Sequence, residues 1–341
     1  MEIRSNSTSQ NYFEFVCMYL ARGGNPNHRD QFQDTLLHLV AKFDYCLEIV
    51  VELAKAGANV NSENFLRQTP LHIAVIHRNL RMVNALLNFG AFVNTQDCRG
   101  NSVLHSAINA CVSKDQDWNC DNPYCPHRAP DMNIIWRLLR HKGINVNIRN
   151  LQGHTPLLWA VKDKNLEIVT ALLLKSANVH IGNYFHETPM HAALSHSNPD
   201  IDIVGELLRR GGSIACFDKN RETPLDRVLK REEVAESNTF LEELVKVVAF
   251  YEKFTDINFL APRVNVKLRK LLEKCIMEKN MMRREIIGDK SLYDVVIQHM
   301  NDTTSAPLEH KIANDILNIL GTGVYSIYFD TISKYIFNFA T

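Results

Sequence analysis

The sequence has no excess of charge of either sign. Its 341 residues include 38 lysines and arginines and 38 aspartates and glutamates, so the formal net charge at pH 7 is zero. Proteins that bind nucleic acids or anionic membranes usually carry a positive field over the binding surface. We therefore expect neither a nucleic acid nor a membrane among the partners.

Long apolar runs and dense cysteines are also missing. No window approaches the eighteen uncharged apolar residues of a membrane span, and the most apolar stretch, residues 316–340, contains Asp330 and Lys334. The first 20 residues lack the apolar region of a secretory signal. Eight cysteines are too few for a disulfide scaffold. We expect a soluble protein with reduced thiols that is located in the cytoplasm. The nucleus is the alternative location.

Familiar catalytic and nucleotide-binding motifs are absent as well. The sequence contains no Gly-x4-Gly-Lys-Ser/Thr, Gly-x-Gly-x2-Gly, His-Glu-x2-His or Gly-x-Ser-x-Gly. Its composition, 45% apolar and 22% charged, is that of an ordinary globular protein. We therefore expect a binding protein that is not an enzyme and needs no cofactor.

A short motif recurs six times along the chain. Thr-Pro-Leu-His at 69–72 has copies that start at residues 35, 102, 155, 188 and 223, with intervals of 34, 33, 53, 33 and 35 residues. A second motif, Gly-Ala-Asn-Val-Asn at 57–61, has full or weaker copies that start at residues 24, 90, 143, 176 and 212. Apolar residues at helical spacing lie between the two motifs. The chain is therefore built from repeated helical units.

These motifs and their period resemble the ankyrin repeat. The resemblance implies an all-α fold, with an ankyrin-repeat solenoid over residues 11–250 followed by a small helical C-terminal domain. The array comprises a truncated first unit and six further units. Residues 251–264 form a connector, and residues 265–341 form the C-terminal domain. Thr begins each first helix, Gly ends each second helix, and the motif histidines hold loop to helix rather than catalyse or bind metal.

In an ankyrin array, the hairpin tips before each Thr-Pro-Leu-His motif project into solvent and line the concave face. The third and fourth residues before each Thr or Ser are therefore the candidate contacts for a protein target, and several of them are aromatic or apolar. The target-binding candidates are Phe32, Phe65, Leu66, Arg99, Tyr184 and Phe185. Packing of these side chains on the neighbouring hairpin is the alternative.

The long interval of 53 residues contains an insertion at 109–130. It carries Cys111, Cys120, Cys125 and His127, which are four ligands of the kind that zinc takes. Their spacing lacks the Cys-x2-Cys pair typical of structural zinc sites. We therefore expect a plain insertion that holds no metal.

The C-terminal segment has three helical patterns, from Leu268 to Met282, from Ser291, and from Pro307. The order Leu272-x2-Cys275-x2-Glu278, then 291–294 (Ser-Leu-Tyr-Asp), resembles the PRANC domain, which follows ankyrin repeats in many poxvirus proteins. Residues 306–312 (Ala-Pro-Leu-Glu-His-Lys-Ile) resemble the start of an F-box.

The two resemblances together imply an adaptor for ubiquitin ligation. The repeats would capture a protein target, and the F-box-like segment would recruit a Skp-type linker and a cullin by laying an apolar helical stripe into a groove. The docking candidates are Pro307, Leu308, Ile312, Ile316 and Leu317. A scaffold or inhibitor that sequesters a partner without recruiting a ligase is the alternative.

Overall fold

The computed structural model describes residues 13–43, 47–109, 131–230, 239–251, 261–262, 266–287, 290–301 and 316. The chain divides into two compact units, Met1–Pro189 and Met190–Thr341. The division lies inside the repeat array, because α10 (Pro189–Ser195) begins at it.

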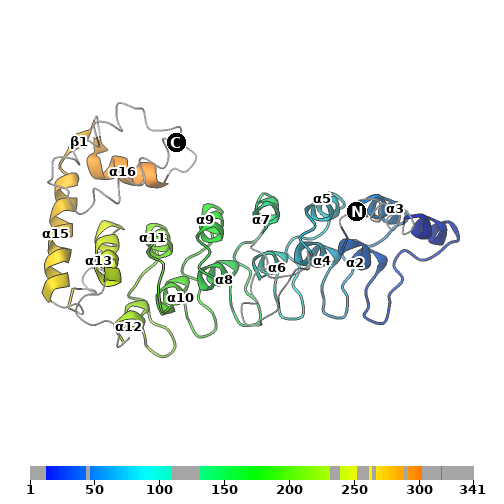
Figure 1. Ribbon diagram of the computed structural model, residues 1–341, viewed down its shortest axis with the longest axis horizontal. Helices are drawn as coiled ribbons and strands as arrows, with labels where there is room; N and C mark the ends of the chain where they lie inside the picture. Colours follow the sequence, from blue (N-terminus) through cyan, green and yellow to red (C-terminus); the bar gives the residue numbers. More distant parts are fainter. Residues whose placement is uncertain are drawn as a thin grey trace, which may run out of the picture. The chain divides into compact units, whose positions relative to one another are not determined.

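The first unit is a stack of antiparallel helix pairs. After a helical segment at 13–21, the inner helices are α2 (Leu36–Ala41), α4 (Pro70–Ile76), α6 (Val103–Asn109) and α8 (Pro156–Lys162). The outer helices are α3 (Leu47–Lys55), α5 (Leu80–Asn88), α7 (Met132–Leu139) and α9 (Leu166–Leu174). Figure 1 shows them as two layers, with long loops extending on the side of the inner layer. The predicted solenoid is confirmed.

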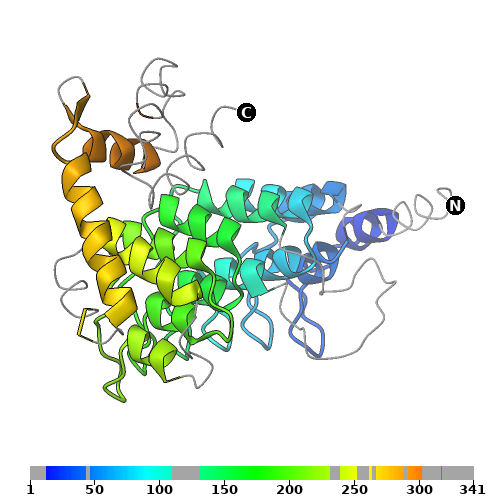
Figure 2. The same ribbon diagram turned by 60° about the vertical axis from the view of Figure 1, so that its left-hand side comes forward.

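The second unit continues with α10, α11 (Ile201–Arg209), α12 (Pro224–Leu229) and α13 (Thr239–Tyr251). It then contains α15 (Val266–Met282), the strands β1 (Ile286–Ile287) and β2 (Lys290–Ser291), and α16 (Leu292–Asn301). Helix α13 packs against both α11 and α15, and α15 runs beside α13 in Figure 2.

Each inner helix begins where the sequence predicts. Thr35 and His38 form a capping box in which the Thr35 N–H donates to His38 Nδ1 at 3.1 Å. The His38 Nε2 atom, which therefore carries the proton, donates to the carbonyl of Gln68 in the next unit at 2.9 Å. A repeat histidine thus caps its own helix, as the resemblance implied, and also ties it to the neighbouring repeat, which was not predicted.

Outer helices begin on asparagine or aspartate caps that the sequence analysis did not identify. Asn79 Oδ1 accepts from the Met82 N–H at 2.9 Å, and Asn165 Oδ1 accepts from the Ile168 N–H at 3.0 Å. Such caps are worth about 1 kcal/mol each because they satisfy donors that the helix leaves unpaired.

The core lies between the helix layers and between successive units. The predicted stripes of α5 and α9 are buried, with Leu86 and Leu172 fully so. Full burial of a leucine stabilises the fold by about 1.5–3 kcal/mol. Since each repeat covers the apolar stripe of the next repeat, the core is continuous along the stack.

Five of the six copies of the Gly-Ala-Asn-Val-Asn motif have a residue with left-handed backbone at or just before their start, as predicted, whereas Gly143, which follows α7, does not take this conformation. Gly57 (φ 84°) and Gly90 (φ 85°) take this conformation in their motifs. In the first and sixth repeats, the left-handed residue lies one position before the motif, at Gly23 and Gly211. Ser176 replaces glycine and still takes φ 59°, a conformation that costs a residue with a Cβ about 1 kcal/mol.

A ladder of asparagines joins successive repeats at the C-terminal ends of the outer helices. The Asn61 amide donates to the Gly90 carbonyl at 3.2 Å, and its Oδ1 accepts from the Phe92 N–H at 2.7 Å. Asn27 and Asn94 form the same pair of hydrogen bonds with the following repeat. The last residue of the Gly-Ala-Asn-Val-Asn motif is therefore an inter-repeat clamp.

The helical patterns predicted from Leu268 to Met282 and from Ser291 are confirmed as α15 and α16. Helix α15 buries Leu268, Leu272 and Cys275, and Ser291 Oγ caps α16 by accepting from the Asp294 N–H at 3.1 Å. The two-stranded pair of β1 and β2, with Ile286 opposite Ser291, was not predicted.

Two further predictions fall largely outside the described residues. The insertion cysteines and His127 lie there, as do Pro307, Leu308, Ile312 and Leu317. Ile316 is described as helical and fully buried. Within the described ranges, the chain has no helix of the length and apolarity that crossing a membrane requires.

Candidate protein-binding surface

The loops on the inner side form five-residue hairpins, which we call fingers. They comprise residues 30–34, 64–68, 97–101, 150–154, 183–187 and 218–222. In each finger, the first N–H donates to the last carbonyl, at 2.9 Å between Asn64 and Gln68 for example. The Asn64 Oδ1 atom also accepts from the N–H groups of Leu66 and Gln68. An Asp or Asn at the first position is the signal in the sequence that marks each finger.

The fourth residue of each finger has a left-handed backbone, and only two fingers place glycine there. Gly100 and Gly153 have φ of 74° and 79°. Both positions require glycine for a second reason, because a Cβ on Gly100 would lie 2.7 Å from the Leu151 backbone nitrogen. The other fingers accept left-handed Gln33, Arg67, His186 and Arg221.

Neighbouring fingers of the first unit are joined through their backbones. The Phe65 N–H donates to the Phe32 carbonyl at 3.0 Å, and the Cys98 N–H donates to the Leu66 carbonyl at 2.8 Å. In the next pair of fingers, the Leu151 N–H donates to the Arg99 carbonyl at 3.0 Å. The tips are therefore held in a continuous, spaced row rather than as independent loops.

The side chains predicted to bind a target are exposed along this row. The apolar ones range in exposure from 47% for Leu66 to 78% for Phe65, and Arg99 is also exposed. Leu151, which shares their position, is 67% exposed. We define the finger row by its seven exposed members: Phe32, Phe65, Leu66, Arg99, Leu151, Tyr184 and Phe185. Exposure at this level argues against packing on the neighbouring finger.

Tyr184 is held beside a charged neighbour. The Arg149 guanidinium lies 4.9 Å from the centre of the Tyr184 ring. A cation over an aromatic face is worth about 0.5–1 kcal/mol at an exposed site. This contact orients one side chain of the finger row before any partner is bound.

A polar cluster lies at the base of the fourth finger. Trp159 Nε1 donates to His154 Nδ1 at 3.1 Å, and Lys162 Nζ lies 3.2 Å from His154 Nε2. Burial and the nearby Lys162 charge lower the pKa of His154 to about 4. His154 is therefore neutral at pH 7 and acts as a hydrogen-bond acceptor for the indole.

The motif histidines are structural. His72 and His105 are fully buried, and burial lowers the pKa of each from 6.5 to about 4. His105 Nε2 lies 3.0 Å from the His154 carbonyl, and its ring meets Trp159 edge to face at 5.1 Å. Among the described residues, no group of three or more His, Cys, Asp or Glu side chains is placed to hold a metal ion.

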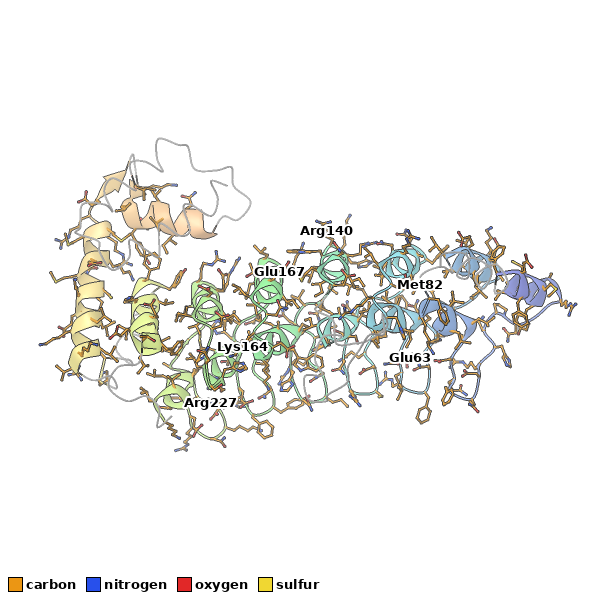
Figure 3. All side chains as sticks on the ribbon, in the orientation of Figure 1. Glu63, Met82, Arg140, Lys164, Glu167 and Arg227 are labelled. Carbon is orange, nitrogen blue, oxygen red and sulfur yellow. The ribbon has the colours of Figure 1, made fainter. Side chains whose placement is uncertain are left out.

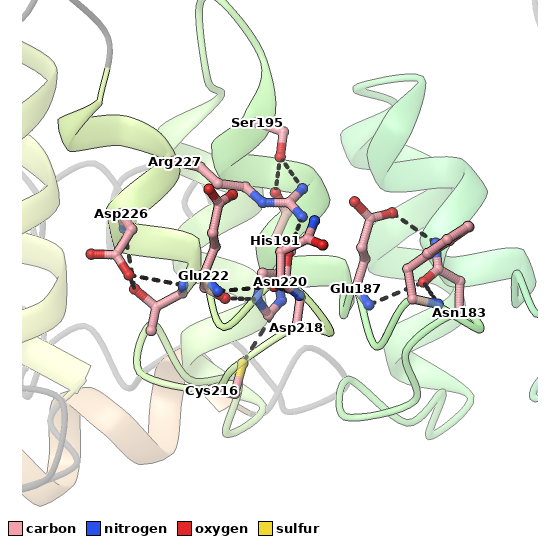
Figure 4. A network of polar contacts seen from close by, with 12 residues as sticks. Asn183, Glu187, His191, Ser195, Cys216, Asp218, Asn220, Glu222, Asp226 and Arg227 are labelled. Carbon is pink, nitrogen blue, oxygen red and sulfur yellow. Dashed lines mark hydrogen bonds and ion pairs between the residues drawn. The ribbon is translucent and has the colours of Figure 1, made fainter.

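The last repeat replaces the motif histidine by Asp226 (Figure 4), whose carboxylate accepts from the Thr223 N–H at 3.0 Å. Next to it, Arg227 pairs with the buried Asp218 carboxylate at 2.6 Å and donates to Ser195 Oγ at 2.7 Å. Burial alone would raise the pKa of Asp218, but hydrogen bonds from the Glu222 N–H and Arg227 outweigh it and lower the pKa. Arg227 thus ties its helix to this finger by an ion pair and to α10 by a hydrogen bond, neither of which the sequence analysis predicted.

Charged residues lie on both the finger side and the outer-helix side of the first unit. In Figure 3, Glu63 lies toward the fingers, whereas Arg140 lies beyond the outer layer, at the end of α7. The exposed apolar residues of the finger row have an arginine in or beside each of the first four fingers, namely Arg29, Arg67, Arg99 and Arg149.

Comparisons with known proteins agree with this architecture. A family model of ankyrin repeats matches residues 6–97, 37–115 and 127–218. The B-cell lymphoma 3 protein homolog of Mus musculus is 28% identical over 217 residues, 58% of this chain and 48% of that protein. An ankyrin repeat protein of fowlpox virus (strain NVSL) is 29% identical over 199 residues, 55% of this chain and 52% of that protein.

The chain therefore spans about half the length of these two relatives. The crystal structure of the human ASB11 ankyrin repeat domain has the same fold, with a TM-score of 0.52 at 22% identity, covering 73% of this chain and 96% of that one. Since the family model covers more than half of the chain, this protein belongs to the ankyrin-repeat family.

Proposed function

We propose that the protein works by binding rather than by catalysis, and that the finger row captures a protein target. The observation that carries this proposal is the line of exposed apolar and aromatic side chains on fingers whose backbones are joined. Scattered exposed apolar residues are normal, but an aligned set with arginine has the composition of protein-binding hot spots.

The test replaces Phe65, Leu66, Tyr184 and Phe185 by serine and compares the proteins captured by the variant and the wild type. Each true hot spot should cost more than about 1 kcal/mol of binding energy. The control replaces Phe89 and Phe92 by serine, because both are exposed outside the fingers. Equal capture by all three folded proteins would refute the proposal.

We further propose that the C-terminal segment makes the protein an adaptor for a Skp–cullin–F-box ubiquitin ligase. The support is the F-box-like sequence at 306–312 and the similarity of the array to a fowlpox ankyrin repeat protein. Pro307, Leu308, Ile312 and Leu317 are the residues proposed to dock. Ile316 is buried within the chain, which favours a packing role for that member of the stripe.

Co-precipitation of the Skp-type linker and cullin tests this second proposal. Leu308→Asp together with Ile312→Asp should abolish recruitment of both, while capture by the repeats persists. If the wild type brings down neither protein, the scaffold or inhibitor alternative replaces the adaptor. If the double variant recruits both as well as the wild type, the stripe is not the docking surface.

A further inference from the structure

We propose that the finger row binds an extended, acidic polypeptide segment that carries apolar residues at intervals of about three. This inference rests on the proposed function and specifies the chemistry of the partner. It draws on three features of the first unit, namely the charge of the fingers, their spacing and the kinds of apolar side chain between the charges.

The exposed charge on the first four fingers is positive, although the chain as a whole is neutral. Each has one exposed arginine in it or directly before it, at 29, 67, 99 and 149. Glu63, a half-buried carboxylate directly before the second finger, lies 3.3 Å from Arg67.

The other carboxylates of these fingers are already engaged in the protein. Asp30 and Asp97 each accept two backbone N–H groups of their own finger through Oδ1. Asp34 is buried and accepts from the Asn64 amide at 2.8 Å. These carboxylates keep their charge but are buried or half-buried, so the exposed charged side chains of these fingers are the four arginines, which favours an acidic segment.

The spacing of the fingers suits an extended chain. Each finger contributes two antiparallel limbs, and neighbouring fingers are joined by backbone hydrogen bonds such as Phe65 to Phe32. Hydrogen-bonded strands lie about 4.8 Å apart, so successive tips recur about every 10 Å. An extended peptide rises about 3.3 Å per residue and would meet one finger at every third residue.

The apolar members of the row favour a polypeptide over a nucleic acid. Bases bind single-strand surfaces by stacking on aromatic rings, which Leu66 and Leu151 do not provide. Both leucines instead match aliphatic or aromatic side chains of a peptide.

The experiment selects binders to the full chain from a random peptide library displayed on phage. We expect enriched sequences that are rich in Asp and Glu and contain apolar residues at intervals of about three. The most enriched peptide is then synthesised, and its Kd is measured for wild type and variants. A single-stranded DNA oligonucleotide serves as the nucleic-acid probe.

Charge variants give the direction of the effect. Arg99→Glu should weaken peptide binding by about fivefold or more, and Glu63→Gln should tighten it, because each changes a charge beside the peptide. Arg81→Glu and Arg140→Glu change exposed arginines of the outer-helix side and should leave the Kd within about twofold. Added salt should weaken the peptide complex.

The inference is overturned if the library yields no peptides, or basic or uncharged ones, or if all four charge variants behave alike. Oligonucleotide binding that is as tight and as sensitive to Arg99→Glu would assign the row to nucleic acid. If serine at Phe65, Leu66, Tyr184 and Phe185 abolishes target capture while the library selects no acidic peptides, the proposed function stands and this inference fails. If those serines leave both kinds of binding unchanged, both proposals fail.

Discussion

Replacing Asn61 by alanine removes a clamp between two repeats without touching the core. The side chain makes two hydrogen bonds to the next unit, at 3.2 Å to the Gly90 carbonyl and at 2.7 Å from the Phe92 N–H. A net contribution of about 0.5–1.5 kcal/mol for each bond gives an expected loss of about 1–3 kcal/mol. Because repeats are stabilised mainly by their nearest neighbours, the loss falls on one interface.

Urea unfolding followed by circular dichroism measures this loss. Asn59→Ala is the matched control, because the Asn59 side chain accepts one local bond from the Asn61 N–H at 2.9 Å and its Oδ1 bridges no further unit. The control should cost less than about 1 kcal/mol. If Asn61→Ala costs no more than Asn59→Ala, the ladder does not contribute to coupling between units.

Further predictions concern three other features. Ser176→Gly should stabilise the chain by about 0.5–1 kcal/mol in urea unfolding, because it relieves a left-handed backbone at φ 59°, and no gain would contradict this. Stability should fall as the pH drops from 6.5 toward 4, because the unfolded chain protonates His72 and His105 at about 6.5 and the folded chain only at about 4; each should cost about 2 kcal/mol at pH 5, and a His105→Asn variant should show a shallower pH dependence. Arg227→Met should cost about 3 kcal/mol or more in thermal or urea unfolding, since it leaves the buried Asp218 carboxylate without its cation, whereas a loss below 1 kcal/mol would show that the backbone donors suffice.

The sequence predicted the repeat architecture because each feature has a local cause. Thr at the helix start, Pro after it and apolar residues at helical spacing act within one unit, so a period near 33 residues reveals them. The ankyrin resemblance implied the local bond of the motif histidine, and His38 makes it, whereas its second bond, to Gln68 of the next repeat, was not predicted. The exposure of Phe65 and its counterparts followed from their place at the hairpin tip.

Two of the features that the sequence analysis missed depend on which residues the fold brings together. The asparagine ladder needs Asn61 placed opposite Gly90, a pairing 29 residues apart that no local pattern indicates. The ion pair of Arg227 with Asp218 appears only when the last finger folds back on its own helix. An Asp or Asn at the first position of every finger was visible in the sequence and could have been recognised as a turn signal.

The central claim is that the finger row contacts a protein target, and site-specific crosslinking tests it most directly. A photoreactive phenylalanine analogue replaces Phe65, Phe185 or, as the control, Phe92, and each protein is irradiated with cell extract. The account predicts crosslinks to one and the same partner from positions 65 and 185, and none to that partner from position 92. Crosslinks of equal yield from all three positions, or none from positions 65 and 185, would contradict it.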